Sequence, residues 1–250
     1  MKLAHSTWPE VEDYLAVSDG IILPVGSTEQ HGPMGLVGTD AICASVIAEA
    51  AGEISGAMVA PTVCYTPAPF NMCFPGTVSI SEETFVAMLS DIIAALSAQG
   101  FKTIYVLNAH GANLAPLRSI GRSLNSVRMP IRSWWQFDPV MRLRKELYGD
   151  WEGLHATPSE VAITQARVRR VAPGPAVEPP RRLSPEEIAE RAGDNHGSPE
   201  RHRREFPDGR VGSHSAMATP EEGARLLAVA AEEVAKDYDL CLRAPRSTRP

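Results

Sequence analysis

The chain has 250 residues, of which 44% are hydrophobic and 22% are charged, and its formal net charge is -6 at pH 7. This length and composition are typical of one globular domain with a substantial core. The negative charge gives no general attraction to nucleic acid or anionic lipid, and no apolar run approaches the roughly 20 residues of a membrane-spanning helix. We therefore expect a single domain over residues 1–245, in a cytoplasmic protein that binds neither nucleic acid nor membranes.

Short apolar runs alternate with helical patterns through the first 135 residues. The apolar runs are rich in Ile, Val and aromatic residues, and they predict strands at 20–25, 57–65, 102–107 and 127–135. Between them, apolar residues at helical spacing predict helices at 41–54, 82–98 and 114–126. This order predicts an α/β fold, a single layered domain in which a mostly parallel central sheet is flanked by helices.

The C-terminal part of the chain has a different composition. Residues 171–185 are rich in proline and residues 193–209 are polar, so we expect a surface loop or lid across 171–210 rather than regular structure. Apolar residues at helical spacing then predict a final helix at 220–236. The last four residues, 247–250, are expected to fray.

The stretch GIILPVGSTEQHGPMGLVGTDA, residues 20–41, joins a predicted buried strand to a glycine-rich turn. The turn carries Glu29, His31 and Asp40 at the carboxyl end of the strand, which is where sites form in open α/β sheets. Glu29 and His31 are two residues apart, so in an extended segment they point to the same side. Two carboxylates and an imidazole without a nearby cysteine suit zinc, manganese or iron.

Two further segments place ligand-type residues near the same predicted edge. In KTIYVLNAHGANLAPL, residues 102–117, a strand ends at a polar turn with His110, and Asn108 or Asn113 could hold that imidazole or a substrate amide. In LHATPSEVAITQA, residues 154–166, His155 precedes a predicted helix start and Glu160 lies in its first turns. Three separate segments therefore converge on one predicted metal site.

Each of these residues also has a simpler interpretation. A lone loop histidine is most often a solvated side chain, and we interpret His5, His196 and His202 in that way. An acid near a helix start commonly stabilises the helix dipole, and this alternative stays open for Asp40 and Glu160. The convergence of the three segments is what favours the metal site.

The motifs, in their order and spacing, resemble the creatininase family, also called creatinine amidohydrolases. The most specific is PVGSTEQHGP followed by Thr39 and Asp40, which matches the family's P-V-G-S-x-E-Q-H-G-P and T-D. The resemblance continues through FPGT at 74–77, NAHGAN at 108–113, the H-A-G-x-x-E-like segment 155–160 and GRVGSHSAMATPEEG at 209–223. It therefore covers nearly the whole chain and implies a creatininase-like fold.

The resemblance implies a pair of divalent metal ions, which we expect to be zinc, manganese or iron. It places Asp40 as the bridge between the ions, Glu29 and His110 on one ion, and His31 on the other. The protein is then expected to be a metal-dependent enzyme with a small-molecule substrate, and by the same resemblance a homo-oligomer, often a hexamer in the family.

Two further roles follow from the resemblance. Ala112 stands where creatininase itself has another glutamate ligand, and by similarity to relatives that lack that acid, Glu160 becomes the fifth ligand. His155 resembles the family's catalytic histidine, which passes a proton to the leaving nitrogen.

The expected substrate pocket departs from that of creatininase. The family usually has histidine where this chain has Met34 and Asn71, and glycine where it has Thr157, so creatinine itself is not the expected substrate. Because Arg and Lys do not cluster in the site segments, a small neutral or cyclic compound is favoured over a phosphorylated one. We expect Trp134 to pack in the core and the pocket to be lined by Asn71, Thr77, Asn108 and Trp151.

The resulting hypothesis is a hydrolase of an amide or cyclic-amide C-N bond, since paired ions lower the pKa of a bridging water and polarise a carbonyl. Two alternatives remain. The same ions would stabilise an enolate, which leaves open a metal-assisted lyase, isomerase or ring-opening hydrolase of a keto-sugar or cyclitol. The second alternative is a non-catalytic metal-binding subunit of a larger assembly.

Overall fold

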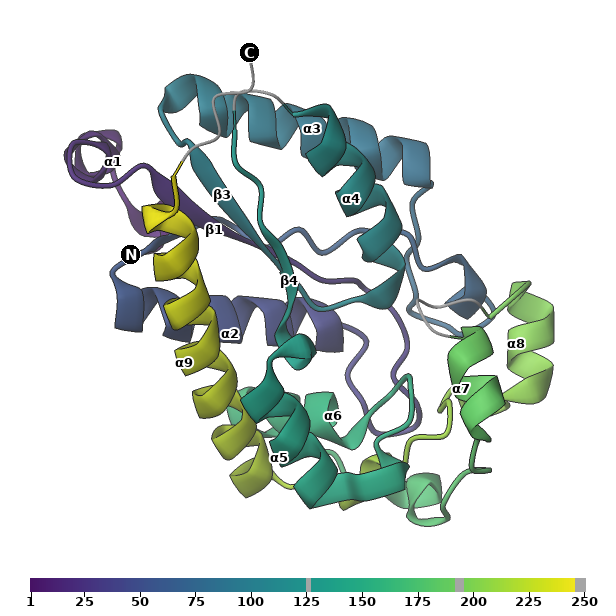
Figure 1. Ribbon diagram of the computed structural model, residues 1–250. Coiled ribbons are helices and arrows are strands. Elements are labelled where there is room, and N and C mark those ends of the chain that lie inside the picture. Colours follow the sequence, from purple (N-terminus) through teal and green to yellow (C-terminus); the bar gives the residue numbers. More distant parts are fainter. Residues whose placement is uncertain (125–126, 192–195, 246–250) are drawn as a thin grey trace.

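A parallel sheet forms the centre of the protein in the computed structural model, which describes residues 1–124, 127–191 and 196–245 (Figure 1). Within these residues the sheet has four strands in the order β2-β1-β3-β4. The strands are β1 (Gly20–Val25), β2 (Met58–Val59), β3 (Thr103–Asn108) and β4 (Ile131–Ser133). The chain steps outward from β1 to β2 and then to the opposite side for β3, so a topological switch point lies between β1 and β3.

The two central strands agree closely with the sequence prediction. All six residues of β1 and all six of β3 are buried, as expected for strands covered on both faces. They pair in parallel from Gly20 with Thr103 to Val25 with Asn108. Their carboxyl ends, which carry the predicted site segments, therefore meet at one edge of the sheet.

The two outer strands are shorter than the sequence predicts. The strand predicted at 57–65 is reduced to Met58–Val59, because Pro61 has no N-H to donate, although Val63 still bridges to Val25. The strand predicted at 127–135 is reduced to Ile131–Ser133, since Pro130 precedes it and a 3-10 turn begins at Trp134.

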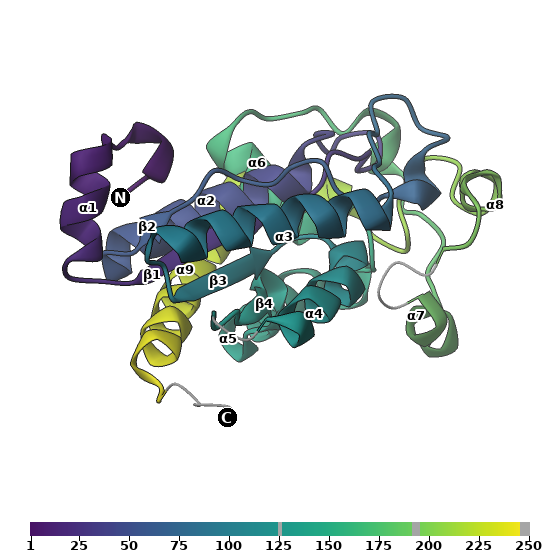
Figure 2. The same ribbon diagram turned by 90° about the horizontal axis from the view of Figure 1, so that it is seen from above.

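Helices cover both faces of the sheet (Figures 1 and 2). One face packs against α2 (Thr39–Ser55), α5 (Asp138–Tyr148), α6 (Pro158–Arg167) and α9 (Pro220–Arg243). The other packs against α1 (Trp8–Leu15), α3 (Glu82–Gln99) and α4 (Leu114–Ser123). The predicted layered α/β fold with its single domain is confirmed. The final helix extends beyond its predicted end, and the prediction for the last four residues lies outside the described part of the chain.

The segment 171–210 contains helices that its composition did not predict. These are α7 (Pro185–Arg191) and α8 (Pro199–Glu205), which lie at one end of the molecule, apart from the two helix layers (Figure 1). Serine hydroxyls accept hydrogen bonds at the starts of both helices, from Glu187 N to Ser184 Oγ and from Arg201 N to Ser198 Oγ. Local capping therefore stabilises short helices in a polar segment.

Two histidines of this segment are buried, contrary to the sequence interpretation. His196 is 2% exposed and His202 is fully buried. Their rings lie 4.5 and 5.1 Å from that of Phe70, measured between centroids. The interpretation of these two as solvated side chains was wrong because it could not foresee that α8 packs against the 3-10 turn at Pro69–Asn71. None of the described helices is both long and apolar enough to cross a membrane.

Candidate metal centre

The loop after β1 brings Asp40 back to the end of the strand. A Cβ atom at Gly26 would lie 2.4 Å from Ala41 N, so only glycine lets the strand end pass this close to the start of α2. The carbonyl of Gly26 accepts hydrogen bonds from Thr66 Oγ1 and Asn113 Nδ2, both at 2.9 Å. Asp40 lies in the first turn of α2 and is 3% exposed. The close packing of loop and helix thus fixes a buried carboxylate at the sheet edge.

The five predicted metal ligands converge in the structure. Asp40 lies between two imidazoles, with Oδ1 at 3.0 Å from His31 Nε2 and Oδ2 at 3.3 Å from His110 Nδ1. Glu29 Oε1 lies 3.2 Å from His110 Nδ1, and Glu160 Oε1 lies 3.6 Å from His31 Nε2. Three segments that are distant in the sequence therefore supply one buried cluster of carboxylates and imidazoles.

The rings of His31 and His110 are held by backbone carbonyls. His31 Nδ1 lies 3.0 Å from the carbonyl oxygen of Glu29, and His110 Nε2 lies 2.9 Å from that of Pro67. A carbonyl only accepts, so each of these nitrogens donates its hydrogen and the other nitrogen of each ring faces the carboxylates. This is the arrangement that orients histidine as a metal ligand.

His155 follows the same pattern. Its Nε2 lies 2.8 Å from the carbonyl oxygen of Gln30. The side-chain amide of Gln30 donates its two hydrogens to Asn71 Oδ1 at 2.7 Å and to the Gly209 carbonyl at 3.0 Å. His155 Nε2 is therefore the donor to the Gln30 carbonyl, and Nδ1 is turned toward Glu29 Oε1 at 3.5 Å. The hydrogen-bond network assigns this tautomer.

The short segment 155–160 contributes both His155 and Glu160 to the cluster. His155 is anchored by a bridge to Val211, and Ala156 adopts a φ of 57°, in the left-handed region that side chains with a Cβ rarely occupy. Thr157 then caps α6, and its backbone N-H donates to Glu160 Oε1 at 2.6 Å. Glu160 thus caps the helix, as one sequence interpretation expected, and the same oxygen faces His31, a position that suits the predicted ligand role.

The charges in the cluster shift the pKa values of its members. Burial lowers the pKa of His31, but the charge and hydrogen bond of Asp40, with Glu160 and Glu29, raise it to about 10. The pKa of His110 is raised well above its usual value, since Glu29 and Asp40 outweigh burial. Burial raises the pKa of Glu160 to about 7 against the influence of His31. The pKa of Asp40 is lowered because the two imidazoles outweigh its burial.

The donor set fits divalent cations. Glu29 Oε1 and Asp40 Oδ2 are buried and accept no hydrogen bond from the described residues, so cations in the cluster would satisfy both oxygens. Oxygen and imidazole donors suit zinc or manganese. Ligand atoms lie within 4.8 Å of one another in three overlapping groups: Glu29, Asp40 and His110; His31, Asp40 and Glu160; and Glu29, His31 and His155.

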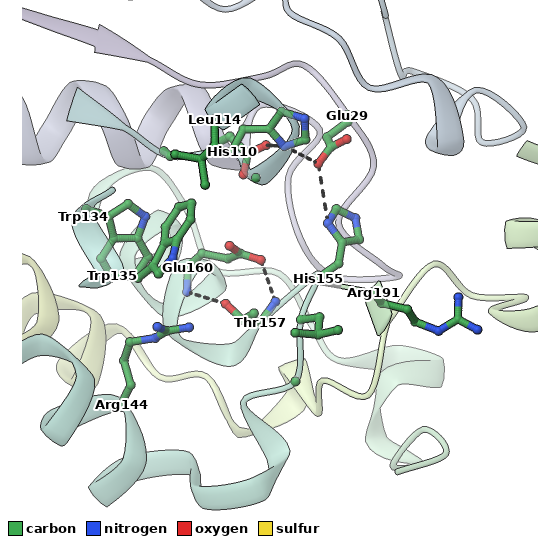
Figure 3. A pocket seen from close by; sticks show the side chains of 15 residues that line it. Glu29, His110, Leu114, Trp134, Trp135, Arg144, His155, Thr157, Glu160 and Arg191 are labelled. Carbon is green, nitrogen blue, oxygen red and sulfur yellow. Dashed lines mark hydrogen bonds and ion pairs between the residues drawn. The ribbon is translucent and has the colours of Figure 1, made fainter. Parts of the chain in front are cut away.

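A cavity of about 340 Å³ opens beside the cluster (Figure 3). This size suits a small organic molecule. Glu29, Asp40, His110, His155 and Glu160 are exposed to it. Other side chains that line it are Ala109, Leu114, Leu154 and Thr157 from two of the predicted segments, and Trp134, Trp135, Arg144 and Arg191 from outside them.

The four residues predicted to line the pocket lie elsewhere. None is among the described residues that line the cavity. Asn71 Nδ2 donates to Glu29 Oε2 at 2.9 Å, and Thr77 Oγ1 accepts from Gln30 N at 3.0 Å. Asn108 Nδ2 donates to the His110 carbonyl at 2.8 Å. Trp151 packs against the Arg182 guanidinium, whose Cζ lies 4.2 Å from the centroid of the Trp151 ring. Asn71, Thr77 and Asn108 therefore form hydrogen bonds to the segments that carry the predicted metal ligands, and they do not line the cavity.

Four side chains that line the cavity were not predicted from the sequence to do so. Trp134 is 1% exposed, as expected for a core residue, yet it also lines the cavity together with Trp135. Arg144 from α5 and Arg191 from α7 line it as well. Neither arginine lies in a ligand segment, so only the packing of α5 and α7 beside the cavity reveals them.

Comparison with known proteins shows the family to which the chain belongs. Residues 4–238 match the family described as creatininase, creatinine amidohydrolase. The chain belongs to the creatininase family. This confirms the resemblance found in the sequence and accounts for the shared order of the ligand segments.

Two curated relatives show different reactions within the family. A 3-dehydro-scyllo-inosose hydrolase from Thermotoga maritima is 36% identical over 106 residues, 42% of this chain and 34% of that protein. A creatinine amidohydrolase from Pseudomonas putida is 28% identical over 181 residues, 64% of this chain and 69% of that protein. The match thus spans only about a third of the first relative. Both are hydrolases by name, while their substrates differ.

Solved structures show the same fold. A crystal structure of creatinine amidohydrolase aligns with a TM-score of 0.79 at 22% identity, over 98% of both chains. Two further creatininase structures are described as a Zn-Zn type, with a TM-score of 0.77 at 22% identity, and as an Mn form, with 0.72 at 23%. Creatininases of this fold therefore exist in zinc and manganese forms.

Proposed function

We propose that this protein is a metal-dependent hydrolase of an amide or cyclic-amide C-N bond that uses two divalent ions. The observation that carries the proposal is the arrangement of His31, His110 and His155. Each ring donates one N-H to a backbone carbonyl and turns its other nitrogen toward buried carboxylates. Because Asp40 faces His31 with one oxygen and His110 with the other, it is the natural bridge between two ions.

The residues of the cluster have distinct roles in this proposal. Glu29, Asp40 and His110 would hold one ion, and His31, Asp40 and Glu160 the other. Such ions lower the pKa of a water between them and polarise the carbonyl that it attacks. His155, fixed by the Gln30 carbonyl, would accept a proton at Nδ1 and deliver it to the departing nitrogen.

The family relationship supports hydrolysis. Both relatives described above are hydrolases, and the creatinine amidohydrolase acts on a cyclic amide by name. The similarity to the inosose hydrolase favours a second candidate, a hydrolase of an oxidised cyclitol. The same metal set would polarise the ketone of such a substrate.

Metal analysis followed by a substrate screen tests the proposal. The purified protein is analysed for zinc, manganese and iron, and then assayed with linear amides, cyclic amides and keto-cyclitols. We expect two ions per chain and cleavage of an amide, with oxygen-18 from labelled water in the acid product. Metal-loaded protein that cleaves only cyclitols would favour the second candidate, and protein that binds no divalent metal would refute both.

A further inference from the structure

Arg144 lines the cavity on the side that faces away from His155. In Figure 3 it lies with Trp134 and Trp135 on one side, while His155 and Arg191 lie on the other. Its side chain is 17% exposed, so the guanidinium is largely withdrawn from bulk solvent. Arg144 therefore places a positive charge at the wall of the cavity.

The guanidinium is held rigidly along one edge. Nε and Nη2 donate to Glu152 Oε1 at 2.9 and 2.8 Å, and Nε also lies 3.3 Å from Ser159 Oγ. Cζ lies 5.6 Å from the centroid of the Trp134 ring. These contacts use the Nε-Nη2 edge of the fork. Nη1 makes no hydrogen bond to any described residue, and Nη2 has a second N-H besides the one that it donates to Glu152, so this end of the guanidinium can still donate two hydrogen bonds.

Arg191, the other arginine of the cavity, is arranged differently. Its Nη2 pairs with Glu205 Oε2 at 2.9 Å, and Cζ lies 5.2 Å from the Phe206 ring centroid. Figure 3 shows its guanidinium pointing away from the other labelled side chains. Arg191 therefore presents its stem to the cavity, whereas Arg144 has a guanidinium end available for a ligand.

The open end of a guanidinium matches a carboxylate, whose two oxygens accept two parallel N-H hydrogen bonds. The charge balance of the site agrees, and this step rests on the proposed function. Glu29, Asp40 and Glu160 contribute three negative charges against four positive charges from two divalent ions. Glu152 balances Arg144 itself. The loaded site has one excess positive charge with a neutral water between the ions and none once that water is hydroxide, so in neither state does it repel an anionic ligand.

We propose that Arg144 is a substrate-recognition residue and that the substrate is a small amide that carries a carboxylate. The cavity of about 340 Å³ limits the size of that molecule. Trp135 and Leu114 supply apolar wall of the same cavity. This replaces the sequence-based preference for a neutral compound, which rested on the ligand segments alone.

Calorimetry with matched probes tests the inference. Manganese-loaded protein is titrated with N-acetylglycine and N-acetyl-β-alanine, which place a carboxylate at two distances from an amide, and with their neutral carboxamides. We expect at least one acid to bind about tenfold more tightly than its carboxamide, as a charged hydrogen-bonded pair contributes. Arg144→Gln should reduce this preference to less than about threefold, whereas Arg142→Gln, an exposed arginine on the same helix, should retain it.

Several results would overturn the assignment. These are equal binding of acids and carboxamides, no binding of either acid, or an undiminished preference in Arg144→Gln, which would mean that the ions alone bind the carboxylate. If Arg144→Gln fails to fold, Arg144→Lys decides, since it retains the charge and loses the fork. Amide hydrolysis is measured separately. A wild-type preference without hydrolysis refutes the proposed function alone, and hydrolysis without a preference refutes this inference alone.

Discussion

The two sides of the cavity are built in different ways. The ligand side comes from short loops at the ends of β1 and β3 and from the start of α6, where backbone carbonyls fix each imidazole. The recognition side comes from Trp134, Trp135 and Arg144, which depend on how α5 packs beside the sheet. Local segments therefore supply the proposed metal ligands, whereas tertiary packing positions the side chains that we propose for substrate recognition.

The strongest way to test the ligand side is Asp40→Asn. Because this carboxylate belongs to both proposed ion sites, we expect the loss of both ions and a fall in turnover of at least about a thousandfold, since no ion remains to activate water. Metal analysis and steady-state kinetics measure the two effects. Glu53→Gln, an exposed acid at the far end of the same helix, is the control and should retain both ions. Full metal content in Asp40→Asn would contradict its bridging role.

His155→Ala separates proton transfer from metal binding. We expect a fall in turnover of about a hundredfold to a thousandfold with the metal content unchanged, because a general acid-base group contributes about that much. His5→Ala, which changes an exposed histidine, should have no effect. Loss of metal in His155→Ala would instead make His155 a ligand, which its position near Glu29 and His31 also allows.

Glu160→Gln should have a smaller effect. We expect the loss of the ion shared with His31, retention of the other ion, and activity lowered by about tenfold to a hundredfold. Since Glu160 also accepts from the backbone of Thr157, the variant Thr157→Ala serves as a control for helix capping. That control should cost about 1 kcal/mol of stability while both ions remain bound. An unchanged metal content in Glu160→Gln would make the residue a helix cap alone.

Removal of the metal should change stability more modestly. Chelation is expected to lower the melting temperature by about 5 to 10 °C for each ion removed, which corresponds to about 2.7 kcal/mol per ion when the free metal is a hundredfold above its dissociation constant. Differential scanning calorimetry with and without a chelator measures the shift. Asp40→Asn should show no such shift. An equal shift in that variant would mean that chelation lowers the melting temperature by removing metal from somewhere other than the cluster.

The same contrast explains what the sequence could predict. Glu29, His31, Asp40 and His110 were found because strand ends at a topological switch meet at one edge, which needs no knowledge of distant packing. Arg144 was not found because nothing in its own segment indicates that α5 borders the cavity.

The predictions of the fold were likewise accurate where local sequence decides the structure and wrong where distant contacts or neighbouring prolines decide it. The fully buried β1 and β3 agree closely with the sequence, whereas β2 and β4 were predicted too long because neighbouring prolines limit their pairing. The burial of His202 depends on Phe70, more than 100 residues earlier in the chain, and no local pattern reports such a contact.

The backbone anchors of the three imidazoles have a consequence for metal exchange. Because a backbone carbonyl holds each ring, we expect one ion to replace another without refolding of the loops, and we expect the fold to discriminate little between zinc and manganese. We expect the metal recovered with the protein to follow the supply in the growth medium.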